Sequence, residues 1–427
     1  AQAAPAAPMA QGANPQEAAS RDAELVLGRY RLSGGPPLGA GGWCVVRRAE
    51  DILTGQAVAV KTYNAQTLRG LDEEGLAARL AREVRTFESL GIGPGGSAAS
   101  GRPDPRRLRA ASARHWLVNL LDFSRDERTG HPGRAADGRY YTVLELADCS
   151  LDAWLRQRAA AKDFVGLEEL REIAGAVARG LAWLHGRGRC HLDIKPDNIM
   201  RFGGLWKLID LESCLACGGD PVGLDSFTPL YASPEVAHFA LGKSSSLVPS
   251  SAMDMWAAGV VMLDVLAHTA ALQETKSGFD AAALFEDESV PFEGWYQWLA
   301  DPDPLDMEGV VAEPASSVQL LRQCSELQEL LKGLLQKDPE HRITSADVLG
   351  HAFLLADLAP RTKVETVFVR LEASSGRGCL TRQQVSSLFA SLGMRRFEAE
   401  ALLQAFVPMR KGHVSFEELM EFIYGPR

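Results

Sequence analysis

Short apolar stretches separated by glycine turns mark the first part of the chain. This pattern runs from about Val26 to Lys61 and returns at 116–121 and 139–146, where it predicts β-strands. Residues 91–114 and 124–138 are rich in glycine, proline, serine and arginine, so they are expected to form exposed loops. The first lobe of the protein should therefore be built on a sheet.

Helical spacing of apolar residues dominates the remainder. Residues 73–90 place apolar side chains three and four positions apart, and the pattern is strong again at 167–186 and 252–268. The apolar positions of the first of these segments are Leu76, Leu80, Val84, Phe87 and Leu90. Residues 270–316 hold many acidic and proline positions and are predicted to be an irregular insertion. A last helical segment, 361–427, follows a helix-breaking proline, so the chain predicts a strand-rich lobe, a helix-rich lobe and a small helical domain.

Composition narrows the classes of function. Residues 1–22 contain almost no large apolar side chain and are predicted to be a flexible tail. The net charge of −10 argues against a nucleic-acid partner or an anionic membrane surface. No apolar run is long enough to cross a bilayer, so we expect a soluble cytoplasmic protein, although the chain starts at Ala1 and an N-terminal address could be missing.

The cysteines are seven in number and scattered, which favours free thiols in a reducing compartment over a disulfide framework. Cys214 and Cys217 form a single C-x-x-C pair. A metal or redox role for this pair is the less favoured alternative, because no second pair lies at zinc-site spacing.

A glycine-rich turn and a lysine point to phosphate binding in the first lobe. The turn Leu38-Gly-Ala-Gly41 precedes Val46, and glycines there would let backbone N–H groups approach phosphates. Lys61 ends the apolar strand Val-Ala-Val, and its expected ionic partner is Glu83 in the following helix. Each signal is weak by itself, because glycine turns and solvent-facing lysines are common.

The most specific signal is the run Cys190-His-Leu-Asp-Ile-Lys-Pro-Asp-Asn-Ile-Met200. It places Asp193 two residues before Lys195 and five before Asn198. Twelve residues after that asparagine, an apolar strand ends at Asp210. A polar surface loop is the bland alternative, but it does not explain the order and spacing of all four groups.

In these motifs the chain resembles the protein kinase family from about Leu27 to Leu354. The resemblance implies an α+β bilobal kinase fold, with a small antiparallel β lobe and a helical lobe. The kinase domain would span 23–357, with its lobes at about 23–147 and 148–357. Three further stretches agree with the family pattern, namely Thr228–Glu235, Asp254–Gly259 and Asp338–Thr344.

The resemblance also implies a role for each site residue, with ATP and Mg²⁺ as cofactors. Asp193 would orient the acceptor hydroxyl and Lys195 would stabilise the transferred phosphoryl group. Asn198 and Asp210 would bind magnesium. The ATP-binding residues would be Leu38, Gly39, Gly41, Val46, Ala59, Lys61, Glu83, Glu145, Ala147 and Met200.

The catalytic-loop lysine and Thr228 are typical of the serine/threonine class. We therefore expect an ATP-dependent serine/threonine kinase that transfers the γ-phosphoryl group of ATP to protein hydroxyls. Three positions depart from the family pattern: Cys44 replaces a glycine, Leu192 an arginine and Glu212 a second glycine. These departures keep open the alternative of a pseudokinase scaffold that binds partners with little or no turnover.

Residues 361–427 resemble an EF-hand pair that has lost its metal ligands. Glycines stand at the sixth place and apolar residues, Leu380 and Val414, at the eighth place of two predicted interhelical loops. At the liganding positions the first loop offers Ala373, Ser375, Arg377 and Gln384, and the second offers Val407, Met409, Lys411 and Glu418. We expect no calcium binding and a role as a docking module for a partner protein. A plain helical bundle is the alternative.

Overall fold

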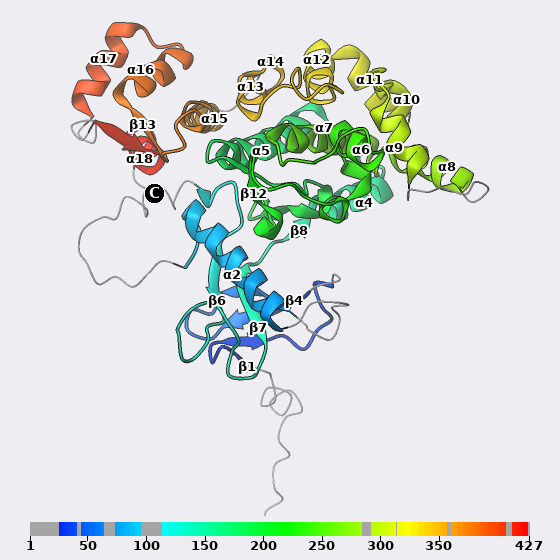
Figure 1. Cartoon of the computed structure of the whole chain (residues 1–427). Helices are drawn as coiled ribbons and strands as arrows, with labels where there is room; N and C mark the ends of the chain where they lie inside the picture. Colours follow the sequence, from blue (N-terminus) through cyan, green and yellow to red (C-terminus); the bar gives the residue numbers. More distant parts are fainter. Residues whose placement is uncertain are drawn as a thin grey trace, which may run out of the picture. The chain divides into compact units, whose positions relative to one another are not determined.

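The computed structural model describes residues 25–40, 44–63, 73–94, 113–283, 292–312, 314–356, 360–406 and 412–425. The chain divides into two compact units. Residues 1–81 and 120–146 form the strand-rich unit, and residues 82–119 and 147–427 form the helical unit. Figure 1 shows the elements coloured along the chain. Helix α2 (Glu73–Leu90) crosses the boundary between the units, and its bounds are those that the apolar spacing predicts.

An antiparallel sheet forms the strand-rich unit. Its described strands follow the order β1-β2-β4-β5-β7-β6, and β3 pairs with β4. The strands are β1 (Leu25–Val26), β2 (Tyr30–Leu32), β3 (Gly39–Ala40), β4 (Cys44–Asp51), β5 (Ala57–Tyr63), β6 (Leu120–Phe123) and β7 (Tyr140–Glu145). Strands β1 and β2, β4 and β5, and β6 and β7 are neighbours both in the chain and in the sheet, whereas β5 pairs with β7 only after the chain has passed through α2 and β6.

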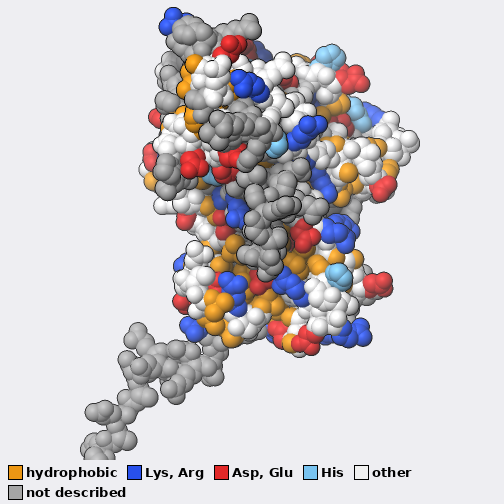
Figure 2. Space-filling view, turned by 90° about the vertical axis from the view of Figure 1, so that its left-hand side faces the viewer, with side chains coloured by type: hydrophobic (Ala, Val, Ile, Leu, Met, Phe, Trp, Pro, Cys, Tyr) orange, Lys and Arg blue, Asp and Glu red, His pale blue; other side chains and the backbone are white. Residues whose placement is uncertain are grey.

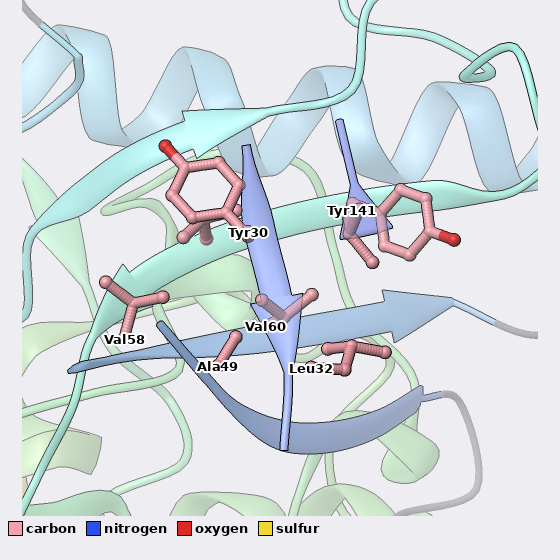
Figure 3. Packing of buried hydrophobic residues seen from close by; sticks show 8 residues of the cluster. Tyr30, Leu32, Ala49, Val58, Val60 and Tyr141 are labelled. Carbon is pink, nitrogen blue, oxygen red and sulfur yellow. The ribbon is translucent and has the colours of Figure 1, made fainter. Parts of the chain in front are cut away.

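The pleat of β5 separates a packed face from a functional face. Val58 and Val60 are buried in one cluster with Tyr30 and Tyr141, which Figure 3 shows gathered together. Alternate residues of a strand point to opposite faces, so Lys61 lies on the other face of the sheet. The apolar alternation of this strand therefore fixes the side on which its lysine emerges.

The first part of the helical unit surrounds two buried helices, α5 and α7. Apolar side chains cover nearly the whole circumference of α7 (Ser251–Ala267), as expected of a helix enclosed by others. The helices up to residue 355 are α4 (Leu151–Ala161), α5 (Leu167–His185), α6 (Pro234–Ala240), α7, α8 (Gln273–Ala283), α9 (Glu293–Ala300), α10 (Met307–Val310), α11 (Ala315–Gln323), α12 (Ser325–Leu334), α13 (Ser345–Gly350) and α14 (Ala352–Leu355). The short strands are β8 (Cys149–Ser150), β9 (Arg189–Cys190), β10 (Ile199–Phe202), β11 (Leu205–Leu208) and β12 (Leu215–Ala216).

The prediction of an irregular insertion at 270–316 is wrong where α8, α9 and α10 lie within that segment. The reason is visible in α9, where Trp295, Tyr296 and Leu299 are buried at helical spacing. Prolines and acidic residues dominate the segment as a whole and mask this short amphipathic pattern. The indole nitrogen of Trp295 donates to the carbonyl of Pro229, 3.0 Å away.

The C-terminal helices belong to the same compact unit. They are α15 (Pro360–Ala373), α16 (Arg382–Ser391), α17 (Arg396–Ala405) and α18 (Phe416–Tyr424), within the segment predicted to be helical. Between them β13 (Cys379–Thr381) and β14 (His413–Ser415) pair antiparallel, with Leu380 opposite Val414. Helix α15 packs on α5 and α13.

The cysteines and the surface were each the subject of an expectation from composition. None of the seven cysteines forms a disulfide, as their scattered positions predict. On the face shown in Figure 2, basic and acidic side chains of the described residues are interspersed. Among the helices that the structure describes, none has the length and apolar character needed to cross a membrane.

A bidentate ion pair ties α6 to the segment before α13. Arg342 donates from both terminal nitrogens to the carboxylate of Glu235, at 2.9 Å each, and its side chain is fully buried. The same guanidinium also donates to the backbone carbonyls of Ala252, Gln336 and Lys337. Removing one partner of such a pair leaves an uncompensated buried charge.

We therefore expect Glu235→Gln to lower the free energy of unfolding by about 3–5 kcal/mol. Urea unfolding followed by circular dichroism measures the change. Glu308→Gln is the matched control, because Glu308 pairs with Arg322 on the exposed surface, and it should leave the unfolding midpoint unchanged. Equal midpoints for the two variants would show that the buried pair does not hold the fold.

A second polar anchor joins α7 to the segment before α6. Asp264 is buried and accepts hydrogen bonds from the Tyr231 hydroxyl (2.8 Å) and the Ala271 amide (2.7 Å). Burial raises the pKa of Asp264 from 3.8 to about 7, although these two donors act in the opposite direction.

The folded protein should thus hold one more proton than the unfolded chain between pH 4 and 7. Stability from this group is complete at low pH and is lost as the pH rises toward 7, by about 1.4 kcal/mol per pH unit. Asp264→Asn cannot titrate, so its stability relative to wild type should improve across this range. Urea unfolding at pH 5, 6 and 7 tests this, and parallel pH profiles for the two proteins would contradict it.

Candidate active site

The polar loop 191–198 follows β9 and is held by a carboxylate of α7. Asp254 is 1% exposed, and its two oxygens accept the amides of His191 and Leu192, each at 2.7 Å. The Asp254 carboxylate also lies 2.9 Å from the His185 ring nitrogen Nε2. Strand β9 pairs with β12, with Cys190 opposite Leu215. The loop therefore leaves a short ladder and is immediately fixed to a buried helix.

Four polar side chains meet at the far end of this loop. The ammonium of Lys195 lies 2.8 Å from Oδ2 and 3.0 Å from Oδ1 of Asp193. The amide of Asn198 donates to Asp193 Oδ2 at 2.8 Å and to its backbone carbonyl at 2.8 Å. The hydroxyl of Thr228 donates to Asp193 Oδ1 at 2.8 Å and accepts from Lys195 at 3.1 Å. The Asp193 carboxylate thus accepts a hydrogen bond from a hydroxyl group while the Lys195 ammonium lies beside it.

The β10–β11 hairpin brings the two predicted metal ligands to one end. Ile199 pairs with Leu208, and the Ile209 amide donates to the carbonyl of Asn198 at 3.0 Å. Asp210, the next residue, has a φ of +60°, which is rare for a residue with a side chain. An aspartate carboxylate and an asparagine amide oxygen are oxygen donors of the kind that magnesium accepts when phosphates supply its other ligands.

The predicted phosphate cradle is assembled within the strand-rich unit. Gly39 lies opposite Val46 on the β3–β4 ladder, and Val46 lies opposite Lys61 on β4–β5. The amide of Leu38 donates to the carbonyl of Val46 at 2.8 Å. Ala59, two residues before the lysine, shares its face of the sheet. The register thus brings together five residues that the sequence spreads over 24 positions.

Other predicted ATP-binding residues are not joined by these contacts. Gly41 lies outside the described residues. Glu83 is on α2 and 1% exposed, but it belongs to the helical unit, so its ion pair with Lys61 stays a prediction. Glu145 ends β7 in the strand-rich unit, whereas Ala147 and Met200 are half-buried in the helical unit.

The sequence does not predict the contacts that Thr228 and His185 make in the site. Thr228 was noted only as a marker of class, and its hydrogen bond to Asp193 joins residues 35 positions apart. His185 gave no sequence signal, yet its ring bridges Asp254 and the Ser345 hydroxyl at 3.0 Å. A lone histidine at the end of an apolar helix carries no mark of such a role.

The three departures from the family pattern have different consequences. Glu212 lies in a short 3₁₀ turn, and it is not among the residues with positive φ, so its backbone does not require the missing glycine. Leu192 is buried with a φ of +67° and lines a small cavity with Phe227 and Met253. Cys44 begins β4 and is half-buried.

Comparisons with known proteins agree with this geometry. The sequence model of the family described as "Protein kinase domain" matches residues 109–354, more than half of the chain. Serine/threonine-protein kinase TOS3 of Saccharomyces cerevisiae (strain YJM789) is 26% identical over 381 residues, which cover 83% of this chain and 60% of that protein. Cyclin-dependent kinase D-1 of Oryza sativa subsp. indica is 24% identical over 327 residues (76% and 66%). CBL-interacting protein kinase 4 of Oryza sativa subsp. japonica is 27% identical over 334 residues (75% and 63%). The chain thus spans 60–66% of the length of these relatives.

Proposed function

The chain belongs to the protein kinase domain family, and on this premise we propose that it is an ATP-dependent serine/threonine kinase acting on protein hydroxyls. The observation that carries the proposal is the contact of Asp193 with Lys195, Asn198 and Thr228. Phosphoryl transfer asks a protein to orient a hydroxyl and to neutralise charge on the phosphoryl oxygens. These side chains supply both functions at one point.

Each residue then has a chemical part. Asp193 accepts the hydrogen bond of a substrate hydroxyl, as it accepts that of Thr228 in the structure, and takes up its proton as transfer proceeds. Lys195 places its positive charge beside the same carboxylate, where the phosphoryl oxygens would approach. The Thr228 hydroxyl is hydrogen-bonded to both Asp193 and Lys195. A substrate hydroxyl that can take its place at these two side chains would be favoured as the acceptor.

ATP and Mg²⁺ are the proposed cofactors. Lys61 and the Leu38–Gly39 turn would bind the phosphates of ATP, and Val46 and Ala59 would contact its adenine. Asn198 and Asp210 would hold magnesium, which neutralises charge on the phosphates. The oxygen donors fit this ion because one carboxylate and one amide leave room for water and phosphate ligands.

A pseudokinase that binds partners without turnover is the alternative function. This alternative is supported by Glu212, which adds a carboxylate two residues after Asp210. That negative charge would repel the phosphates of ATP. The intact cluster around Asp193 favours the enzyme. Magnesium-dependent ATP turnover by the purified chain decides between the two.

We also infer that residues 361–427 form a degenerate EF-hand-like pair, a docking or bracing module that works without calcium. Two observations support this. The two loops pair through Leu380 and Val414, and the side chains at their twelfth positions are used as helix caps. Gln384 accepts the amide of Thr381 at 2.9 Å, and Glu418 accepts that of Ser415 at 3.0 Å.

Asp193→Asn should abolish phosphoryl transfer and leave ATP binding nearly intact. Removing the base should lower kcat by about a hundredfold to ten-thousandfold. Radiolabel transfer to a protein substrate measures the first effect, and fluorescent-nucleotide titration measures the second. Asp163→Asn, which changes an exposed aspartate of the same unit, controls for the substitution itself. A variant at residue 193 as fast as wild type would overturn the assignment.

Calcium should not regulate the protein. Gln384 and Glu418 already accept backbone amides, and among the described residues no group of three or more acidic, histidine or cysteine side chains could hold a metal ion. Calorimetric titration of the full chain should show no heat of calcium binding, and kinase rates in chelator and in excess calcium should agree. Micromolar affinity, or a several-fold change in rate, would refute this.

A further inference from the structure

The backbone that leads into the catalytic loop contacts the C-terminal helices at two glycines, Gly186 and Gly376. Gly186 precedes Arg187 in the turn between α5 and β9. A Cβ added at Gly186 would lie 2.6 Å from the carbonyl oxygen of Ala373, at the end of α15. A Cβ added at Gly376 would overlap the carbonyl oxygen of Gly186. The α5–β9 turn and the loop after α15 are thus in direct backbone contact, and neither Gly186 nor Gly376 leaves space for a side chain.

The side chain of Arg187 extends from this turn to the carboxylate of Glu372. Its terminal nitrogens lie 3.0 and 3.3 Å from the two carboxylate oxygens, and the Glu372 side chain is fully buried. The guanidinium also stacks 3.5 Å from the centre of the Trp183 ring and donates to the Trp183 carbonyl at 3.0 Å. A planar guanidinium held on one face and along one edge has little freedom, so the pair has a defined geometry.

Glu372 in turn organises the first interhelical loop. Its Oε1 accepts the amide of Gly378 at 2.5 Å, and its backbone carbonyl accepts the amides of Ser375 and Gly376 at 2.8 and 2.9 Å. An EF-hand loop folds around a divalent cation that its carboxylates surround. Here the loop folds around one carboxylate, and its cation is the guanidinium of Arg187.

Arg187 lies close to the catalytic loop in the sequence, so its pair with Glu372 can affect the position of that loop. It stands six residues before Asp193, and the carbonyl of the next residue, Gly188, accepts the amide of Cys217 at 2.8 Å. The turn therefore holds the start of the catalytic loop and the segment that follows Asp210. A second contact, from Arg179 to the Thr366 hydroxyl at 3.1 Å, fixes α15 along α5.

We propose that Arg187 is a positioning residue for the proposed kinase reaction: by binding Glu372 it fixes the start of the catalytic loop, and the C-terminal helices brace the active site from outside it. The proposal rests on the proposed function, because only turnover reveals the effect on catalysis. It assigns the C-terminal domain a permanent intramolecular partner, the α5–β9 turn of the same chain.

Glu372→Gln tests the proposal, because it removes the charge but keeps an oxygen for the Gly378 amide. We expect kcat to fall about tenfold from misplacement of Asp193, with the KM for ATP changed less than about twofold. Arg187→Lys keeps the charge and one hydrogen bond, so it should retain most of the kcat. Arg361→Gln, on the exposed part of the same helix, is the matched control and should match wild type. All rates are compared at a temperature where circular dichroism shows every variant to be folded.

Hydrogen exchange supplies a readout that does not depend on activity. The amides of residues 189–193 should exchange about fivefold faster or more in Glu372→Gln than in wild type or the control. If the wild-type chain does not turn over ATP, the proposed function fails, and exchange alone then decides the inference. If a folded Glu372→Gln keeps wild-type kcat and exchange, the pair is only structural and the proposal is overturned. If that variant does not fold, Arg187→Gln, which leaves Glu372 bonded to Gly378, is measured in the same way and decides.

Discussion

The geometry of the candidate active site depends on one buried carboxylate, that of Asp254. It accepts two consecutive amides of the catalytic loop and meets the ring of His185, which is bonded in turn to Ser345. Consecutive amides that point the same way cannot both be satisfied by a strand partner, so a loop of this shape needs an acceptor with two oxygens. Because Asp254 lies in the first turn of α7, the helix dipole also favours its negative charge. A buried helix of the helical unit, α7, thereby fixes the position of the loop that carries Asp193.

Two residues near this anchor have a strained backbone. Leu192 and Asp210 have φ angles of +67° and +60°, each of which costs about 1–3 kcal/mol for a residue other than glycine. The single hydroxyl proton of Ser213 is shared between the carbonyls of His191 and Asp210, at 2.9 and 3.2 Å, so that this side chain links the two strained segments. The strain directs the carboxylate of Asp193 toward Lys195 and Thr228. Asp254 and Ser213 hold the loop in this conformation through its backbone. The side chain at position 192 therefore only has to fill an apolar space, which leucine does.

Sequence reasoning predicted the parts whose information is local. Helix α2 was predicted with its bounds because its apolar residues repeat at 3.6 positions, and Asp193, Lys195 and Asn198 were recognisable because the reagents lie within six residues. The bond from Thr228 to Asp193 was not predictable, since it depends on the path of 35 intervening residues. The segment containing α9 was misassigned because three buried residues, Trp295, Tyr296 and Leu299, are too few to outweigh the surrounding prolines and acids.

The same limit accounts for the C-terminal domain. Counting ligands at the expected loop positions, which begin at Ala373, omits Glu372, one residue earlier. A carboxylate that is fully buried needs a compensating charge, and that charge comes from a distant part of the chain. Its cation comes from Arg187, 185 positions away and itself held by Trp183. A guanidinium fixed by the fold cannot dissociate as a calcium ion does. The Arg187–Glu372 pair therefore holds the first interhelical loop against the α5–β9 turn through a cation that belongs to the chain itself.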